Sequence, residues 1–418
     1  MTPEHLFDPH VALDLLRELR ALTADEHGAQ RVAWTETWRK ARAWFAHQLV
    51  GLPLETHRDA AGNVWVTLKG QSEKALILGS HLDSVPNGGW LDGALGVLAA
   101  FAILKHYATA PEPPPVTIRL VDWADEEGAR FGRSLFGSSA FAGTHSIAAD
   151  RNRTDKDAIT LEEALYANGI HIDQIGDASA ERANAEAYLE LHIEQGPVLE
   201  TLGLPLGAVL GTKGVERHAI TFYGQEAHSG STPMNQRRDA LAAAAKLALE
   251  IRNVAGKHPD AVCTMGSLKT YPGIVTAVVG RAEATLDQRD LDATVLAQMH
   301  QEALEASYRF AAEEGCSVNW SRIWNIEPVP FHPDLIKLCE EALLECAGQS
   351  HRLPSGPLHD AAEVARLGIP TTMMFVQSLR GISHNKIEDT AEEHLLMAVE
   401  AFHRLTQKTI DWILSQPN

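Results

Sequence analysis

Histidine and acidic residues gather in two short segments, each directly after an apolar run. The first segment contains His81 and Asp83 and is closely followed by Asp92, and the second contains the adjacent pair Glu126 and Glu127. Imidazole nitrogens and carboxylate oxygens are ligands for zinc and related divalent ions, and a catalytic site keeps one position open for water. The two segments therefore indicate a metal-dependent hydrolase.

Further candidates for such a site lie later in the chain, at His192 and His384. Hydrolysis of an amide near neutral pH needs an activated water, a polarised carbonyl and a proton shuttle. Two divalent ions roughly 3.5–4 Å apart can supply the first two if a carboxylate bridges them, and a separate carboxylate then serves as base. Spacing alone does not decide which of Glu126 and Glu127 would bind metal. Each residue taken singly is also compatible with a core histidine or a solvated acidic loop.

The elements around these residues predict an α/β fold. Val64–Leu68 alternates as a half-buried strand, Ala75–Leu78 and Val116–Val121 are apolar strands, and Asp92–Tyr107 between them has the pattern of a buried helix. This order predicts a mostly parallel sheet covered by helices. Ligands of open α/β sheets bind at the carboxyl ends of the strands, which is where the two acidic segments fall.

A second domain is expected because 418 residues exceed what a single core usually supports. The pattern changes in the middle of the chain, where predicted strands alternate with long helices. These elements are Gly207–Tyr223, Pro233–Ala255, Val275–Arg289 and Leu291–Glu314. We therefore expect a di-metal catalytic domain made of residues 1–207 and 325–418, with an α+β domain over residues 208–324 inserted into it.

Composition narrows the partners and the compartment. The 36 basic and 55 acidic residues give a net charge of −19, which argues against nucleic acid or an anionic membrane as a partner. The longest apolar segment, Ala94–Leu104, is shorter than the ~20 residues that span a membrane, and we see no secretory signal. The four scattered cysteines lack metal spacing and indicate reduced thiols. We expect a cytoplasmic protein.

Taken together and in order, the motifs resemble those of one family. They read GSHLDSV, LDG, DEEGARFG, LHIEQGP and GISHN. This order resembles the amidase, hydantoinase and carbamoylase branch of the di-metal aminoacylase/carboxypeptidase family, the M20-type peptidases. That branch includes N-carbamoyl-L-amino acid hydrolases, β-ureidopropionases and allantoate amidohydrolases. The resemblance runs from about Gly28 to the last predicted helix.

The resemblance implies a role for each candidate residue. The implied ligands of two ions (zinc, manganese or cobalt) are His81, Asp92 and His192 for the first, and Asp92, Glu127 and His384 for the second. Asp92 would bridge the ions. Glu126 would be the general base that takes a proton from the attacking water and returns it to the leaving nitrogen. Asp83 would orient His81 from behind, as outer carboxylates commonly do for metal-bound imidazoles.

The inserted domain would be a lid that mediates formation of a homodimer. By family analogy, His228 would stabilise the oxyanion in the active site of the partner subunit. Arg289 would grip the substrate carboxylate with its bidentate fork. Gln195 would line the pocket, and we assign a pocket role to His359. Thr276 stands where carbamoylases usually carry an asparagine that helps to bind the carboxylate.

The expected function is hydrolysis of the carbamoyl C–N bond of an N-carbamoyl-L-amino acid or a related ureido acid. Thr276 and the pair Pro357 and Leu358, which replaces smaller residues of the family's loop, leave open a hydrolase of N-acyl amino acids or dipeptides with the same metals. A remote alternative is a ligand-binding relative without catalysis. The presence of every expected ligand and of the base argues against that alternative.

Overall fold

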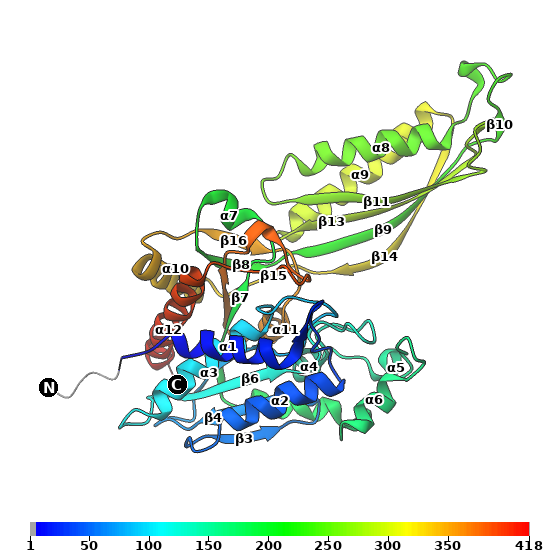
Figure 1. Cartoon of the computed structure of the whole chain (residues 1–418). Coiled ribbons are helices and arrows are strands. Elements are labelled where there is room, and N and C mark those ends of the chain that lie inside the picture. The colour runs from blue at the N-terminus through cyan, green and yellow to red at the C-terminus, as the bar shows by residue number, and fades with distance from the viewer. Residues whose placement is uncertain (1–5, 418) are drawn as a thin grey trace. The chain divides into compact units, whose positions relative to one another are not determined.

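The computed structural model describes residues 6–417, and these form two compact units (Figure 1). One unit runs up to Leu210 and resumes at Phe331, and the other is Gly211–Pro330. The insertion expected from the sequence, residues 208–324, has slightly different limits. In the part of the chain described here, no helix is long and apolar enough to cross a membrane.

A nine-stranded sheet forms the centre of the first unit, in the order β15-β8-β17-β7-β5-β6-β4-β3, with β16 paired to β8. Its edge strand β15 and the last two residues of β8 fall within the range Gly211–Pro330. The strands are β3 (Glu55–Arg58), β4 (Val64–Leu68), β5 (Ala75–His81), β6 (Thr117–Trp123), β7 (Ala185–Ile193), β8 (Leu206–Thr212), β15 (Val329–Pro330), β16 (Arg352–Ser355) and β17 (Thr371–Val376). The four central strands β17, β7, β5 and β6 are parallel, and antiparallel strands flank them on both sides. The expected α/β class is confirmed.

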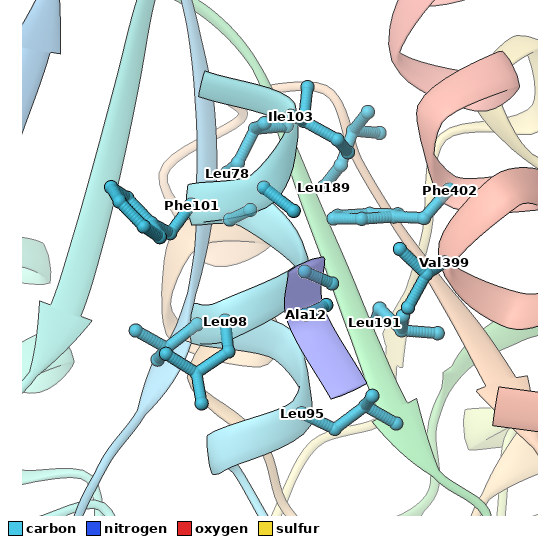
Figure 2. Close-up of a cluster of buried hydrophobic side chains, with 14 of the residues drawn as sticks. Ala12, Leu78, Leu95, Leu98, Phe101, Ile103, Leu189, Leu191, Val399 and Phe402 are labelled. Atoms are coloured by element: carbon cyan, nitrogen blue, oxygen red, sulfur yellow. The ribbon is translucent and has the colours of Figure 1, made fainter. Parts of the chain in front are cut away.

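Helices cover both faces of this sheet because its buried strands are apolar on both sides. On one face Leu76 and Leu78 pack with α1 (His10–Thr23), α2 (Glu36–Gln48), α3 (Ala94–Ala108), α10 (Pro333–Ala347) and α12 (Glu392–Ser415). On the other face Ile77 packs with α4 (Phe136–Ala142) and α11 (Asp360–Arg366). Figure 2 shows Leu95, Leu98 and Phe101 of α3 in the first of these cores, beside Leu78, Leu189 and Leu191. Each fully buried leucine contributes about 1.5–3 kcal/mol, so α3 is held firmly in place.

The remaining short elements of this unit connect the layers. They are β1 (Ala24–Asp25), β2 (Gly28–Ala29), α5 (Ile147–Asp150), α6 (Leu161–Ala167), η1 (Ile172–Arg182), α7 (Val198–Leu202) and η3 (Leu379–Gly381).

The second unit is a four-stranded antiparallel sheet with two helices packed on it. Its elements are β9 (Gly214–Tyr223), β10 (Ala227–His228), η2 (Met234–Gln236), α8 (Ala240–Ala255), β11 (Val262–Tyr271), β12 (Ala277–Val278), β13 (Arg281–Asp290), α9 (Ala293–Glu313) and β14 (Ser317–Ile326), with sheet order β11-β13-β9-β14. Alternate residues such as Ile220, Phe222 and Leu286 are buried with α8 and α9. The predicted helix start at Pro233 was wrong, because Asp239 caps α8 by accepting bonds from the amides of Leu241 and Ala242.

Candidate active site

The end of β5 and the start of α3 place His81 and Asp92 together. His81 is the last residue of β5, and Asp92 lies two residues before α3. Gly93, which lies between Asp92 and the first residue of α3, has φ 64°, and a Cβ there would lie only 2.3 Å from the His81 ring. The expected helix start at Asp92 was therefore early, since Gly93 leaves helical geometry and packs directly on the imidazole. His81 Nε2 lies 3.8 Å from Asp92 Oδ1.

Asp92 faces different histidines with its two carboxylate oxygens. Its Oδ1 lies 3.2 Å from His192 Nε2, and its Oδ2 lies 3.4 Å from His384 Nε2. Glu127 Oε2 is 3.2 Å from the same nitrogen of His384. Two sets of potential ligands result, His81–Asp92–His192 and Asp92–Glu127–His384, and each has its ligand atoms within 4.8 Å of one another. Asp92 belongs to both sets.

The donor atoms of this cluster fit divalent ions. His81 Nδ1 lies 3.1 Å from the carbonyl oxygen of Asp83, and His192 Nδ1 lies 2.9 Å from that of Ile193. These contacts fix a proton on Nδ1 and turn the other ring nitrogen toward Asp92. Among the described residues, the buried Nε2 atoms of His81 and His192 have no hydrogen-bond partner. A divalent ion would satisfy both nitrogens, and mixed nitrogen and oxygen donors suit zinc, manganese and cobalt.

The loop after β6 carries Glu126 into the same cluster. Glu126 is buried, and its Oε2 lies 3.6 Å from His81 Nε2. Asp83 holds the loop, because its Oδ1 and Oδ2 accept bonds from the amides of Glu126 and Glu127, each at 3.2 Å. The Asp83 carboxylate is 3.6 Å from His81 Nδ1, farther than the Asp83 carbonyl. The Asp83 carboxylate thus makes its closest contacts with the loop of Glu126 and Glu127. The Asp83 carbonyl oxygen lies closer to the His81 imidazole than the carboxylate does.

Burial and crowding of carboxylates raise several pKa values. Burial raises the pKa of Glu126 well above its usual range; attraction to His81 opposes this shift, and repulsion from Asp360 adds to it. Burial, together with repulsion from Asp92, raises the pKa of Glu388 to about 7. Carboxylates packed this closely need added positive charge to remain ionised together. Divalent cations would supply that charge.

Gln195 and His359 adjoin the ligand cluster from the side of β7 and α11. Gln195 Nε2 donates to Asp92 Oδ2 at 2.8 Å. The His359 ring lies 4.4 Å from that of His192, and its Nε2 is buried without a hydrogen-bond partner in the described residues. Burial first, and then repulsion from His192, lowers the pKa of His359 well below its usual range. The lowered pKa favours the neutral imidazole of His359.

The remaining predicted site residues lie in the second unit, at different places. His228 is in β10, paired with β12, and the Ser229 amide donates to the Thr276 carbonyl at 2.9 Å. Arg289 is close to the end of β13, where its Nε donates to Asp287 Oδ1 at 2.8 Å. Strand β13 begins at Arg281, next to β12, and Arg289 lies near its other end. A strand rises ~3.3 Å per residue, so roughly 26 Å separates these two residues. Figure 1 shows β10 beyond the Arg281 end of the sheet.

Comparison with known proteins identifies the family. Residues 77–408 match the model of peptidase family M20/M25/M40. The chain belongs to this family. It is 36% identical to N-carbamoyl-L-amino acid amidohydrolase of Geobacillus stearothermophilus over 93% of this chain and 94% of the relative. It is 32% identical to allantoate amidohydrolase of Bacillus subtilis, over 91% and 92% of the two chains.

Solved structures place the chain in a branch of the M20 family. An amidase of the hydantoinase/carbamoylase family from Burkholderia multivorans is 30% identical, with a TM-score of 0.88 over 100% of both chains. A second such amidase, from Burkholderia phymatum, is 31% identical, with a TM-score of 0.86 over 98% of this chain and 99% of the other. The chain is accordingly an amidohydrolase of the hydantoinase/carbamoylase branch, as the motifs predicted.

Sequence reasoning missed residues that surround the M20 ligand set without belonging to its motifs. Arg31 is fully buried, and its Nε donates to the Leu82 carbonyl at 2.8 Å, beside Asp83. Ser383 and Glu388 lie against Asp92 and bind it directly. Arg31 and Glu388 lie outside the quoted motifs, and Ser383 was read only as part of the one around His384. Burial of Arg31 and Glu388 becomes visible only in the folded chain.

Proposed function

We propose that this chain hydrolyses the carbamoyl C–N bond of an N-carbamoyl-L-amino acid or a related ureido acid. Water adds to the ureido carbonyl, the bond to the amino-acid nitrogen breaks, and the carbamate released decomposes to carbon dioxide and ammonia. The observation that carries this proposal is Asp92, which belongs to both ligand sets with Glu126 close by. The names and the coverage of the relatives support the choice of ureido substrates.

The proposed ligands are His81, Asp92 and His192 for one ion and Asp92, Glu127 and His384 for the other. Bound there, a pair of divalent ions such as zinc, manganese or cobalt would supply Lewis acidity toward a carbonyl oxygen and toward water. The burial of four of these side chains keeps their geometry fixed and excludes competing solvent. His384 has a half-exposed side chain, which leaves that side of the site open to a substrate.

Glu126 is the proposed general base and acid. It does not belong to either ligand set, so its carboxylate is available to hold a proton. A buried carboxylate with a raised pKa is a stronger base near neutral pH than an exposed one. Glu126 would accept a proton from the attacking water and deliver it to the amino-acid nitrogen as the C–N bond breaks.

Substrate recognition is proposed to use Gln195, His359 and Arg289, with His228 supplied by a second chain. Gln195 and His359 offer hydrogen bonds to the ureido group, and Arg289 offers its fork to the carboxylate. In one chain His228 lies farther from Arg289 than the length of a small ureido acid, since most of β13 separates them. That separation supports the proposal that His228 acts in the site of the partner subunit of a homodimer.

A second candidate function is hydrolysis of N-acyl amino acids or dipeptides at the same metals. It is favoured by Pro357 and Leu358, which lie half-buried directly before His359. Because His359 adjoins the ligand cluster, bulk at these positions changes the wall next to the scissile group. Thr276 also weakens the case for a carbamoylase, because it stands where that class usually carries an asparagine that helps to bind the carboxylate.

Ammonia release separates these functions. Enzyme reconstituted with divalent ions is incubated with N-carbamoyl-L-amino acids, 3-ureidopropionate and allantoate, and ammonia is measured with and without a chelator. Metal-dependent ammonia from one of them is the expected result. Silence across this panel, with turnover of N-acyl amino acids, would support the second function. Binding of ureido acids without any turnover would support a non-catalytic protein.

A further inference from the structure

Glu388 binds the chain segment that carries Asp92. Its side chain is buried, and its Oε1 accepts hydrogen bonds from the backbone amides of Leu91 and Asp92, both at 3.1 Å. Glu388 and Asp92 are 296 residues apart in the sequence. A buried carboxylate is costly unless such donors compensate for lost water, so these contacts account for its position.

The second oxygen of Glu388 reaches the carboxylate of Asp92 through one side chain. Ser383 Oγ lies 2.9 Å from Glu388 Oε2 and 2.8 Å from Asp92 Oδ2. Gln195 Nε2 lies 2.8 Å from the same Asp92 oxygen and 3.2 Å from Ser383 Oγ. Asp92 is thus held at its backbone by Glu388 and at its Oδ2 by Ser383 and Gln195. Both contacts limit rotation of the carboxylate that is shared by the two ligand sets.

The glycine at position 89 shows that the loop is built around Glu388. A Cβ at Gly89 would lie 2.0 Å from the Glu388 carboxylate. The backbone of Gly89 has no positive φ that would itself require glycine. A side chain at position 89 would therefore displace the Glu388 carboxylate from its present place, and glycine leaves room for it.

We propose that Glu388 is a positioning residue of the metal centre, which fixes the backbone of Asp92 and, through Ser383, the orientation of its carboxylate. This inference rests on the proposed di-metal site. Removing Glu388 would leave the two amides of the loop without their acceptor. It would also remove one of the two carboxylates that share the single hydroxyl proton of Ser383. Asp92 would then present its oxygens in a range of orientations, and both ions would bind more weakly.

The test compares four variants by metal affinity, kcat, KM and thermal stability of the metal-free protein. Glu388→Ala removes all three contacts. Glu388→Gln keeps one carbonyl oxygen for the two amides and gains an NH₂ group that can donate to Ser383 Oγ. Ser383→Ala removes the link to the Asp92 carboxylate, along with the Gln195 contact, and leaves the two amide bonds of Glu388 in place. Asp389→Asn is the matched control, because it removes the charge of the next acidic residue in the chain. Asp389 is exposed, and its side chain lies 3.3 Å from Trp90 Nε1.

We expect Glu388→Ala to weaken binding of Mn²⁺ or Zn²⁺ by ~10–100-fold and to lower kcat, as loss of an outer contact of a metal ligand typically does. Glu388→Gln should recover most of the metal affinity, Ser383→Ala should show part of the loss, and Asp389→Asn should behave as wild type. Where Glu388→Ala fails to fold, the Glu388→Gln and Ser383→Ala pair still carries the comparison.

Two results would overturn the inference. One is unchanged metal affinity in Ser383→Ala together with unchanged affinity in whichever Glu388 variants fold. The other is a loss of stability in Glu388→Ala with normal metal affinity, which would make Glu388 a structural residue only. Wild-type protein that binds two ions without cleaving ureido acids would refute the proposed substrate and leave the role of Glu388 intact. Wild-type protein that binds no ion would refute both.

Discussion

Asp83 holds the backbone of Glu126: its Oδ1 accepts the Glu126 amide at 3.2 Å. The two residues follow neighbouring parallel strands, β5 and β6, so one hydrogen bond joins the loop of His81 to the loop of the proposed base. The same carboxylate binds the amide of Glu127 with its other oxygen. Position of the base and position of a proposed ligand therefore depend on one buried side chain.

Asp83→Asn is expected to lower kcat by ~10–100-fold, the usual effect of losing an outer contact of a metal site. The NH₂ group of asparagine cannot accept a hydrogen bond, so the amide of Glu126 or of Glu127 loses its partner in a buried place. Steady-state kinetics and metal content, measured on the same preparation, check this result. Wild-type kcat in a correctly folded variant would show that other contacts hold the loop.

Glu126→Gln is expected to keep both ions and to lower kcat by at least ~10²-fold, the lower end of what general acid–base catalysis supplies. Glutamine has nearly the same shape but cannot take a proton from water at neutral pH. Metal analysis and kcat of the reconstituted variant provide the measurement. Near-normal turnover would remove Glu126 from the role of base.

Ligand substitutions are expected to remove the ions selectively. His192→Asn should lower the content from about two ions per chain to about one, His384→Asn should do the same at the other set, and Asp92→Ala should remove both, because a bridging carboxylate serves two ions. Metal analysis after dialysis against a weak chelator distinguishes these outcomes. Loss of only one ion in Asp92→Ala would contradict the bridging role.

Stability is expected to fall between pH 6.5 and pH 4 because of His403, which lies in α12 and packs against Phe7. Burial, with repulsion from His106, lowers its pKa to about 4. In the unfolded chain this histidine takes up a proton near pH 6.5. The contribution of neutral His403 to the free energy of unfolding is therefore complete above pH 6.5 and is lost as the pH falls toward 4. At pH 5 the loss is about 2 kcal/mol.

Urea unfolding of wild type and His403→Phe at pH 7.5 and pH 5.0 measures this contribution. The phenylalanine variant should lose less stability than wild type between the two pH values, because it has no group to protonate. Parallel losses in the two proteins would assign the pH dependence to other residues.

Local patterns predicted the elements whose limits are set by local chemistry. The strand Val64–Leu68 has the predicted limits. The helix expected over Leu291–Glu314 is α9, Ala293–Glu313, which begins directly after its capping residue Asp292. The start of α8 was missed because capping by Asp239 decides it, and the alanine-rich pattern carries no sign of that choice. The five residues of the two candidate ligand sets, and Glu126, had all been proposed from motifs and resemblance.

Contacts between distant segments were beyond the sequence. Glu388 and Asp92 have no pattern in common, and only the fold brings the carboxylate of one to the amide of the other. Whether His81 meets the carbonyl or the carboxylate of Asp83 depends on a backbone turn that residue types do not specify. Reasoning from residue types thus found the candidate ligands together with Asp83 and Gln195, and it left out Glu388 and the part played by Ser383.

His228 lies beyond one end of β13 and Arg289 lies near the other end. Intragenic complementation can therefore test whether the two residues reach one site from different chains. With His228 acting across the dimer, His228→Ala and Arg289→Ala chains are each nearly inactive as homodimers. A mixed dimer has one site with both residues intact and one site with neither. Co-expression of the two defective chains should therefore restore turnover, whereas a site built from a single chain would give no rescue.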